Sequence, residues 1–149
     1  MKIINQPKFG EELQNLSFTK KENNFVTYYE EGVQAGFPSP AEDFTEHKLS
    51  LDEKYLNNPD ATFLIKVIGS SMYPTLHVGD LLIVKSDIDF TDNKIGIIAV
   101  NNTDFTVKRY NKNNEILVAD NKEFSNIKIQ EDDTLLCLGV VVNLIRDVV

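Results

Sequence analysis

The sequence predicts a mostly β domain of several short strands, preceded by an extended or weakly helical N-terminal arm and two short helices. From residue 62 onward, runs rich in β-branched and aromatic residues are separated by turn residues, a pattern typical of an all-β unit. Ahead of these runs, two segments begin with helix-capping residues. The first 34 residues are polar and weakly periodic. We therefore expect residues 1–35 to form an arm and residues 36–149 to form the β domain.

The length and composition fit one folded unit with an appendage, because 149 residues of which 42% are hydrophobic can bury a single core. The formal net charge of −8 argues against direct DNA binding, since phosphate contacts need clustered Lys and Arg. The single cysteine, Cys137, cannot form an internal disulfide and lies in an apolar run, which predicts a core thiol in a reducing compartment. No stretch approaches the roughly 18 apolar residues of a membrane span. We expect a soluble, cytoplasmic protein with no membrane association.

The arm and the segment that follows it differ in backbone freedom. Residues 1–34 lack the amphipathic helices with a basic face that a helix-turn-helix domain needs. In residues 34–40, Gly36 widens the accessible backbone conformations and two prolines hold the chain extended, without N–H donors for a sheet. We expect this segment to be exposed and accessible.

Two helix starts precede the strands. Residues 39–42 (Ser-Pro-Ala-Glu) combine a capping serine, a proline at the first helical position and a glutamate three residues after the serine. Residues 50–53 (Ser-Leu-Asp-Glu) form a second capping box. These signatures predict helices near 40–48 and 51–57, and the second ends before Pro59.

The β-type runs are short and bounded by turn residues. They lie at 62–68, 80–84, 95–100, 105–110, 115–118 and 134–145. Residues 101–104 (Asn-Asn-Thr-Asp) join two of these runs and predict a hairpin turn, because asparagine tolerates positive φ.

Residues 68–84 carry the most chemical information. Their pattern predicts a strand ending at Gly69, a Ser-Ser-Met turn, a helical turn started by Pro74, and a Gly-Asp turn into an apolar strand. A serine at such a junction can present its hydroxyl together with nearby backbone N–H groups, as acyl transfer requires. On spacing alone, Ser70 and Ser71 are better explained as turn or cap hydroxyls.

A serine nucleophile needs a base, and the two histidines offer little. His47 lies in a polar segment predicted to be helical, and His77 lies six residues from Ser71 without an evident orienting acid. A Ser-His-Asp triad is therefore not expected. A lysine can serve instead if burial brings its pKa from about 10.4 toward neutrality.

One candidate lysine stands in a predicted strand. The alternation of side chains in residues 105–110 places Phe105 and Val107 on one face, and Thr106 and Lys108 on the other. The strand by itself does not bury Lys108, and its pattern more readily describes a solvated lysine.

Three separated motifs give this chain a family resemblance. Residues 69–75 (Gly-Ser-Ser-Met-Tyr-Pro-Thr), then Gly-Asp-Leu-Leu at 79–82 and Phe-Thr-Val-Lys-Arg at 105–109, resemble the Ser/Lys self-cleaving peptidase family that contains the LexA repressor and the mutagenesis protein UmuD. The resemblance implies that Ser71 is the nucleophile and Lys108 its general base. Their separation of 37 residues matches the family's spacing.

The resemblance extends to a cleavage segment. Residues 35–43 (Ala-Gly-Phe-Pro-Ser-Pro-Ala-Glu-Asp) resemble the cleavage region of UmuD-type members, which implies a cut between Ala35 and Gly36 that removes the arm. The implied fold is the compact, multi-stranded C-terminal domain of the LexA/UmuD type. In the implied mechanism, Lys108 takes the proton of Ser71, whose hydroxyl attacks the carbonyl of Ala35. Backbone N–H groups around Ser70 and Ser71 are the candidate oxyanion donors. No cofactor and no metal are implied.

Two functions from different classes remain open, and a third is less favoured than either. The UmuD-type reading implies a homodimer, cleavage stimulated by the RecA–single-stranded-DNA filament, and a truncated form that joins a Y-family polymerase subunit (UmuC-like) for translesion synthesis in the DNA-damage (SOS) response. The alternative is the C-terminal domain of a LexA or phage-type transcriptional repressor without its DNA-binding domain. The short, non-basic arm favours the first, since such repressors use about 60–80 residues for a helix-turn-helix domain. A signal-peptidase-like protease is a third reading, and it would need a membrane anchor.

Overall fold

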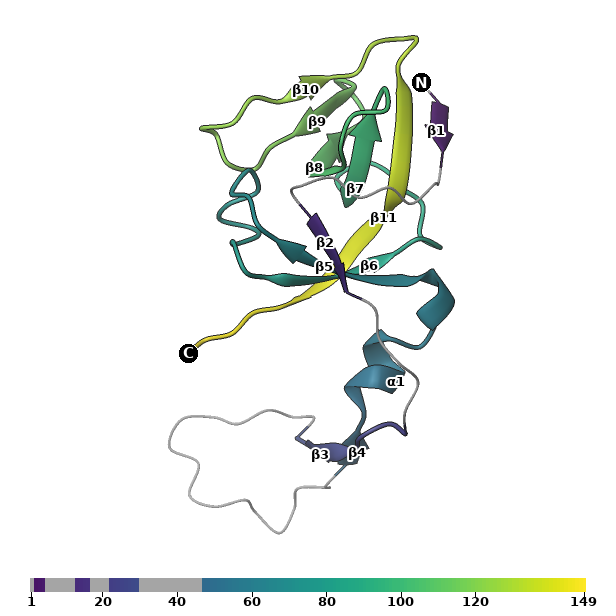
Figure 1. Cartoon of the computed structure of the whole chain (residues 1–149), viewed down its shortest axis with the longest axis vertical. Coiled ribbons are helices and arrows are strands. Elements are labelled where there is room, and N and C mark those ends of the chain that lie inside the picture. The colour runs from purple at the N-terminus through teal and green to yellow at the C-terminus, as the bar shows by residue number, and fades with distance from the viewer. Residues whose placement is uncertain (1, 5–12, 17–21, 30–46) are drawn as a thin grey trace. The chain divides into compact units, whose positions relative to one another are not determined.

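The chain divides into two compact units, each described here by itself. The computed structural model describes residues 2–4, 13–16, 22–29 and 47–149 (Figure 1). The larger unit comprises Met1–Phe18 and Pro59–Val149, and the smaller one comprises Thr19–Asn58. The predicted mostly β fold is confirmed. Within the described residues, regular helical structure is limited to one five-residue helix and one 3-10 turn.

The larger unit is built on a nine-stranded sheet, and the 3-10 turn Pro59–Ala61 leads into its strand β5. Its strands are β1 (Lys2–Ile4), β2 (Leu13–Leu16), β5 (Thr62–Val67), β6 (Leu81–Lys85), β7 (Ile95–Val100), β8 (Thr106–Asn111), β9 (Ile116–Val118), β10 (Ile127–Lys128) and β11 (Thr134–Ile145). The order in the sheet is β10-β9-β8-β7-β11-β6-β5-β2, and β1 pairs with β11 in parallel. All other neighbours are antiparallel. All six predicted runs are strands, whereas β1, β2 and β10 were not predicted.

Strand β11 joins the two halves of the sheet. It pairs with β7 through residues 135–140 and with β6 through residues 140–145, and Figure 1 shows it running between them. Both pairings shift register, one between Cys137 and Gly139 and the other between Val141 and Asn143. These irregularities let one twelve-residue strand change partners along its length.

The alternation of side chains along β11 supplies two hydrophobic clusters. Leu136 and Leu138 belong to the first cluster, whereas Leu135 and Cys137 belong to the second. Because both faces of the strand are buried here, its sequence is a continuous apolar run. The prediction that Cys137 is a core residue is confirmed, and burial raises the pKa of its thiol to about 11.

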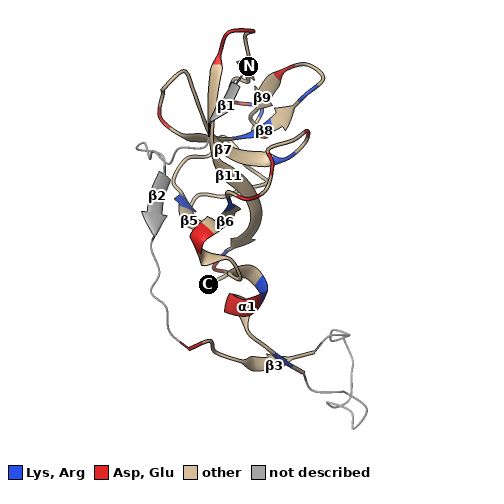
Figure 2. Cartoon of the chain, turned by 90° about the vertical axis from the view of Figure 1, so that its right-hand side faces the viewer, with Lys and Arg blue, Asp and Glu red and all other residues tan. Residues whose placement is uncertain are grey.

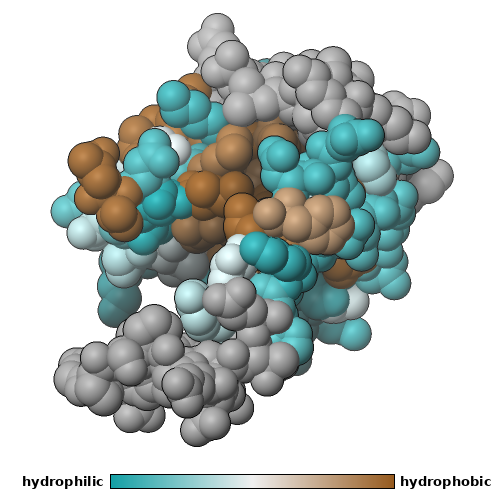
Figure 3. Space-filling view, turned by 90° about the horizontal axis from the view of Figure 1, so that it is seen from below, coloured by the Kyte–Doolittle hydropathy of each residue, from teal (hydrophilic) through white to brown (hydrophobic). Residues whose placement is uncertain are grey.

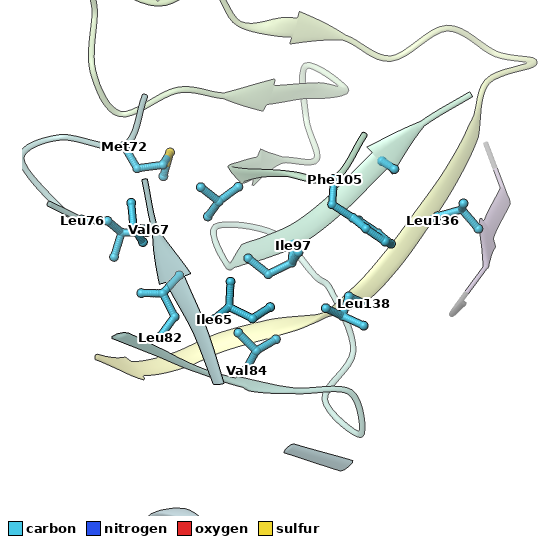
Figure 4. Packing of buried hydrophobic residues seen from close by; sticks show 12 residues of the cluster. Ile65, Val67, Met72, Leu76, Leu82, Val84, Ile97, Phe105, Leu136 and Leu138 are labelled. Atoms are coloured by element: carbon cyan, nitrogen blue, oxygen red, sulfur yellow. The ribbon is translucent and has the colours of Figure 1, made fainter. Parts of the chain in front are cut away.

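The first cluster supports the loop between β5 and β6. Figure 4 shows that Met72 and Leu76, from that loop, lie against side chains of the sheet. The fully or largely buried members are Ile65, Val67, Met72, Leu76, Leu82, Val84, Ile97, Ala99, Phe105, Val107, Leu136 and Leu138. The loop is therefore part of the core and not an appendage to it.

The turns of the larger unit follow the sequence signals. Asn101 and Asn102 adopt positive φ values of 54° and 63° between β7 and β8, which confirms the predicted hairpin turn. Figure 2 shows acidic residues at several turns that join the strands.

The smaller unit contains β3 (Val26–Tyr28), β4 (His47–Leu49) and the helix α1 (Leu51–Tyr55). The second predicted helix is confirmed, and its capping residue Ser50 accepts a 3.4 Å hydrogen bond from the backbone N–H of Glu53. The helix ends at Tyr55, before the predicted position, because Leu56 leaves the helical region with φ −118° and ψ 31°.

The prediction of a first helix near 40–48 is wrong at the C-terminal end of that segment. His47 and Lys48 lie in β4, where they pair with β3. Strand pairing with Thr27 and Tyr28 supplies backbone hydrogen bonds that the capping signature could not anticipate. Residues 40–46 of this predicted helix lie outside the described residues.

Candidate active site

The loop of residues 68–80, called the serine loop below, leaves β5 and returns to β6. Two backbone hydrogen bonds close its base: Gly79 N–H donates to Val67 O at 2.8 Å, and Val67 N–H donates to Asp80 O at 2.9 Å. Gly79 has a φ of +96°, which an L side chain would strain. Met72 and Leu76 are 1% and 2% exposed, so the loop is held at both its base and its middle.

The serine loop places Ser71 against Lys108 of β8. The amine Nζ of Lys108 donates to Ser71 Oγ at 3.2 Å, and the two residues are only 6% and 7% exposed. The same amine donates to Thr106 Oγ1 at 2.9 Å and to Val107 O at 3.1 Å. Thr106 and Lys108 share a face of β8, as the alternation predicted.

This pair has the arrangement that serine nucleophiles require. Burial disfavours the ammonium form of a lysine, and a neutral amine within hydrogen-bond reach can accept the hydroxyl proton. With a neutral amine the hydrogen bond would run in the opposite direction, from the serine hydroxyl to the amine, which is how a serine nucleophile is activated. The candidate catalytic pair thus joins two side chains from distant parts of the sequence.

A second loop, residues 119–126, holds the serine loop by its backbone. The backbone N–H of Asn121 donates to Ser71 O at 3.0 Å, and its side-chain Nδ2 donates to Ser70 O at 2.9 Å. The backbone N–H of Asp120 lies 3.4 Å from the sulfur of Met72. Sequence reasoning missed Asp120 and Asn121, because nothing in their local pattern indicates a partner 50 residues away.

The carboxylate of Asp120 links the strand of the lysine to the serine loop. Arg109 donates to it through Nε at 2.9 Å and through a terminal nitrogen at 2.7 Å, and Thr75 Oγ1 donates at 2.6 Å. These bonds, from Arg109 above all, hold the pKa of Asp120 below its ordinary value. Because Arg109 follows Lys108, the carboxylate connects the two elements that supply the candidate catalytic pair.

The end of β11 is tied to the other end of the serine loop. Asp80, only 1% exposed, accepts two hydrogen bonds of 2.7 Å from the guanidinium of Arg146 and one of 2.8 Å from the backbone N–H of His77. The hydrogen bonds from Arg146 lower the pKa of Asp80. Arg146, the residue that follows β11, therefore stabilises the return of the loop into β6.

The other candidate residues are placed as follows. His77 contacts Pro74 O through Nε2 at 3.1 Å, and its ring centroid lies 5.0 Å from that of Tyr73. The predicted cleavage residues Ala35 and Gly36 lie outside the described residues.

The mostly β fold and the candidate Ser71–Lys108 pair fit the class of serine peptidases. A family model described as Peptidase S24-like matches residues 27–142, and the chain belongs to this family. The predicted LexA/UmuD-type relationship is confirmed. In the part of the chain that the structure describes, every helix is too short to cross a membrane.

Three relatives illustrate the relationship. Protein MucA of Salmonella typhimurium is 36% identical over 85 residues, covering 56% of this chain, and Protein SamA of the same species is 43% identical over 82 residues, covering 54%. A LexA repressor of Acidithiobacillus ferrooxidans is 38% identical over 120 residues, covering 76%. Each match spans 58% of the relative's own length.

Proposed function

We propose that this protein is a self-cleaving serine peptidase of the DNA-damage (SOS) response that cuts its own chain between Ala35 and Gly36. The single observation that carries the proposal is the 3.2 Å contact between the buried Nζ of Lys108 and Ser71 Oγ. Membership of the Peptidase S24-like family supports it.

In the proposed step, neutral Lys108 accepts the proton of Ser71, and Ser71 Oγ attacks the carbonyl carbon of Ala35. The peptide bond to Gly36 breaks when Lys108 returns the proton to the leaving amine, and water later releases the ester formed on Ser71. The N–H groups of Ser70 and Ser71 are the proposed oxyanion donors. Because the arm and the site belong to one chain, the effective concentration of the scissile bond is high.

The test is incubation of the full chain at alkaline pH, followed by intact-mass measurement. We expect a fragment of residues 36–149, and a cut elsewhere contradicts the site. Lys108→Arg and Ser71→Ala should each abolish the cut while the protein stays folded, because arginine does not deprotonate and alanine has no nucleophile. The double variant should be no worse than either single variant.

Two conservative substitutions serve as matched controls. Lys112→Arg makes the same change at an exposed residue four positions away, and Ser125→Ala does so at an exposed serine. Both controls should cleave at the parental rate. Retained, pH-dependent cleavage in Lys108→Arg would exclude Lys108 as the base.

The truncated form is proposed to act as a subunit of a translesion DNA polymerase. The partners proposed with it are a second copy of this chain, the RecA–single-stranded-DNA filament as the stimulator of cleavage, and a Y-family polymerase subunit of the UmuC type. A co-purification experiment tests the last of these: the cleaved protein should retain the polymerase subunit, and the Ser71→Ala protein should retain less.

Apolar side chains at the end of β11 support the proposed homodimer. Leu144 and Ile145 are 37% and 50% exposed. As a separate observation, the face drawn in Figure 3 has brown apolar surface among teal hydrophilic surface. Sedimentation of the full-length Ser71→Ala protein at micromolar concentration checks this, and a monomer contradicts it.

The C-terminal domain of a LexA or phage-type transcriptional repressor without its DNA-binding domain is the second candidate, because the LexA repressor match covers more of this chain than the MucA match does. The co-purification experiment discriminates the two, because retention of the polymerase subunit by the cleaved protein is expected of the first function alone.

A further inference from the structure

The backbone carbonyls of Ser70 and Ser71 both accept hydrogen bonds from one residue, Asn121. Its backbone N–H donates to Ser71 O at 3.0 Å, and its side-chain Nδ2 donates to Ser70 O at 2.9 Å. A single residue about 50 positions away thus contacts two successive carbonyls at the proposed nucleophile.

The side chain of Asn121 is itself fixed in place. Its Oδ1 accepts a 3.1 Å hydrogen bond from the backbone N–H of Glu123, and its carbonyl accepts one of 3.0 Å from Phe124 N–H. Because Glu123 N–H can only donate and Ser70 O can only accept, the amide has one consistent orientation. Asn121 therefore presents a pre-oriented donor to the serine loop.

The contact with Ser70 O determines where the N–H of Ser71 points. The peptide between Ser70 and Ser71 is trans, so its C=O and N–H point in opposite directions. A carbonyl turned toward Asn121 turns the Ser71 N–H away from the 119–126 loop. Ser70 O also accepts from Tyr73 N–H, but at the longer distance of 3.2 Å.

We propose that Asn121 is a positioning residue that orients the backbone N–H of Ser71 as an oxyanion donor. The inference rests on the proposed function, since it requires Ser71 to attack a carbonyl. Asn121 itself touches neither the reacting atoms nor Lys108 through any of these four hydrogen bonds. Its loss therefore reduces the stabilisation of the developing negative charge and leaves the proton acceptor in place.

Asn121→Asp is the sharpest variant. It keeps the shape of the side chain and the oxygen that accepts from Glu123 N–H. It replaces the Nδ2 donor with a carboxylate oxygen, which cannot donate to Ser70 O and repels it. Asn126→Asp is the matched control, because it adds the same charge to the same loop and keeps the oxygen that accepts from Ala119 N–H at 3.0 Å. Asn121→Ala is the second variant and removes the donor without adding charge.

Two rates are measured at a temperature where every variant is folded. The first is self-cleavage as a function of pH. The second is labelling of Ser71 by a fluorophosphonate, in which the Oγ–P bond forms, fluoride leaves, and the hydroxyl proton passes to Lys108. Labelling depends on the serine and its oxyanion donors but not on residues 35 and 36, so it separates this inference from the cleavage-site assignment.

We expect Asn121→Ala and Asn121→Asp to lower the plateau of both rates by about 10- to 100-fold, while Asn126→Asp matches the parent. In Asn121→Ala the pH at half-maximal cleavage should stay at the parental value, an outcome that a purely structural role does not produce. Parental rates in folded Asn121→Ala overturn the inference. An unreactive parent overturns the proposed function instead.

Discussion

The hydroxyl of Thr106 lies 2.9 Å from the amine of Lys108, two residues further along the same face of β8. As an acceptor, Thr106 Oγ1 stabilises the ammonium form of Lys108 relative to the neutral amine. Thr106→Val removes the acceptor at nearly constant volume, so deprotonation becomes easier. We expect the pH of half-maximal self-cleavage to fall, because the ammonium form loses one hydrogen-bond acceptor.

Thr103→Val is the control for this experiment, because the Thr103 hydroxyl donates to Val100 O in an exposed turn. Its cleavage profile should coincide with that of the parent. A midpoint for Thr106→Val that stays in place or moves to higher pH contradicts the stabilising role assigned to Thr106.

Asp120 is expected to stabilise the arrangement of the site. Asp120→Asn keeps one oxygen, and it loses the charge and the two-point contact with Arg109. Because the pair is partly solvated, we expect the free energy of unfolding at neutral pH to fall by about 1–2 kcal/mol. Urea denaturation measures the change, with Asp132→Asn in an exposed turn as the control. Equal losses in both variants contradict a specific role for Asp120.

Much of the fold is predictable because its signals are local. Alternating apolar residues and turn residues predict the strands, and Ser50 with Glu53 predicts the start of α1. The same reasoning fails at His47 and Lys48, because their strand depends on pairing with residues about 20 positions earlier. A capping signature reports what a segment prefers alone and contains no information about a partner strand.

The residues of the candidate site also separate into those that local sequence signals predict and those that depend on distant partners. Alternation correctly places Thr106 and Lys108 on one face of β8. The burial of Lys108 depends on the serine loop, which is distant in sequence, so its strand pattern alone describes a solvated residue. Asp120 and Asn121 hold that loop from a further segment, and only the folded structure brings them together.

Gly139 occupies a position in β11 where a side chain has no room. A Cβ at this residue would lie 2.6 Å from Lys85 O, a backbone atom of β6, so the strands would have to separate. We expect Gly139→Ala to lower the free energy of unfolding by about 1–3 kcal/mol. Thermal denaturation measures the change. An alanine variant as stable as the parent contradicts the close approach of β11 and β6.

The ion pair between Asp80 and Arg146 should make stability depend on pH in the acid range. The pKa of Asp80 in the folded protein lies below its ordinary value of 3.8, first because Arg146 donates hydrogen bonds to the carboxylate. The folded state therefore holds fewer protons than the unfolded state. The pair's contribution is fully present above the unfolded pKa, and it is lost as the pH falls through the lower pKa of the folded protein.

Asp80→Asn cannot titrate, so it should lose this contribution at neutral pH and show a shallower decline of stability below about pH 4 than the parent. We expect its free energy of unfolding at neutral pH to be about 1–3 kcal/mol lower, because the buried position also loses its charged hydrogen bonds. Thermal denaturation from pH 7 to pH 2 measures both effects, with Asp132→Asn again as the control. The difference between Asp80→Asn and the parent should narrow steadily as the pH falls, since protonation of Asp80 removes the same charge from the parent. A difference that stays constant down to pH 2 would mean that the carboxylate charge contributes nothing and that only the shape of the side chain matters.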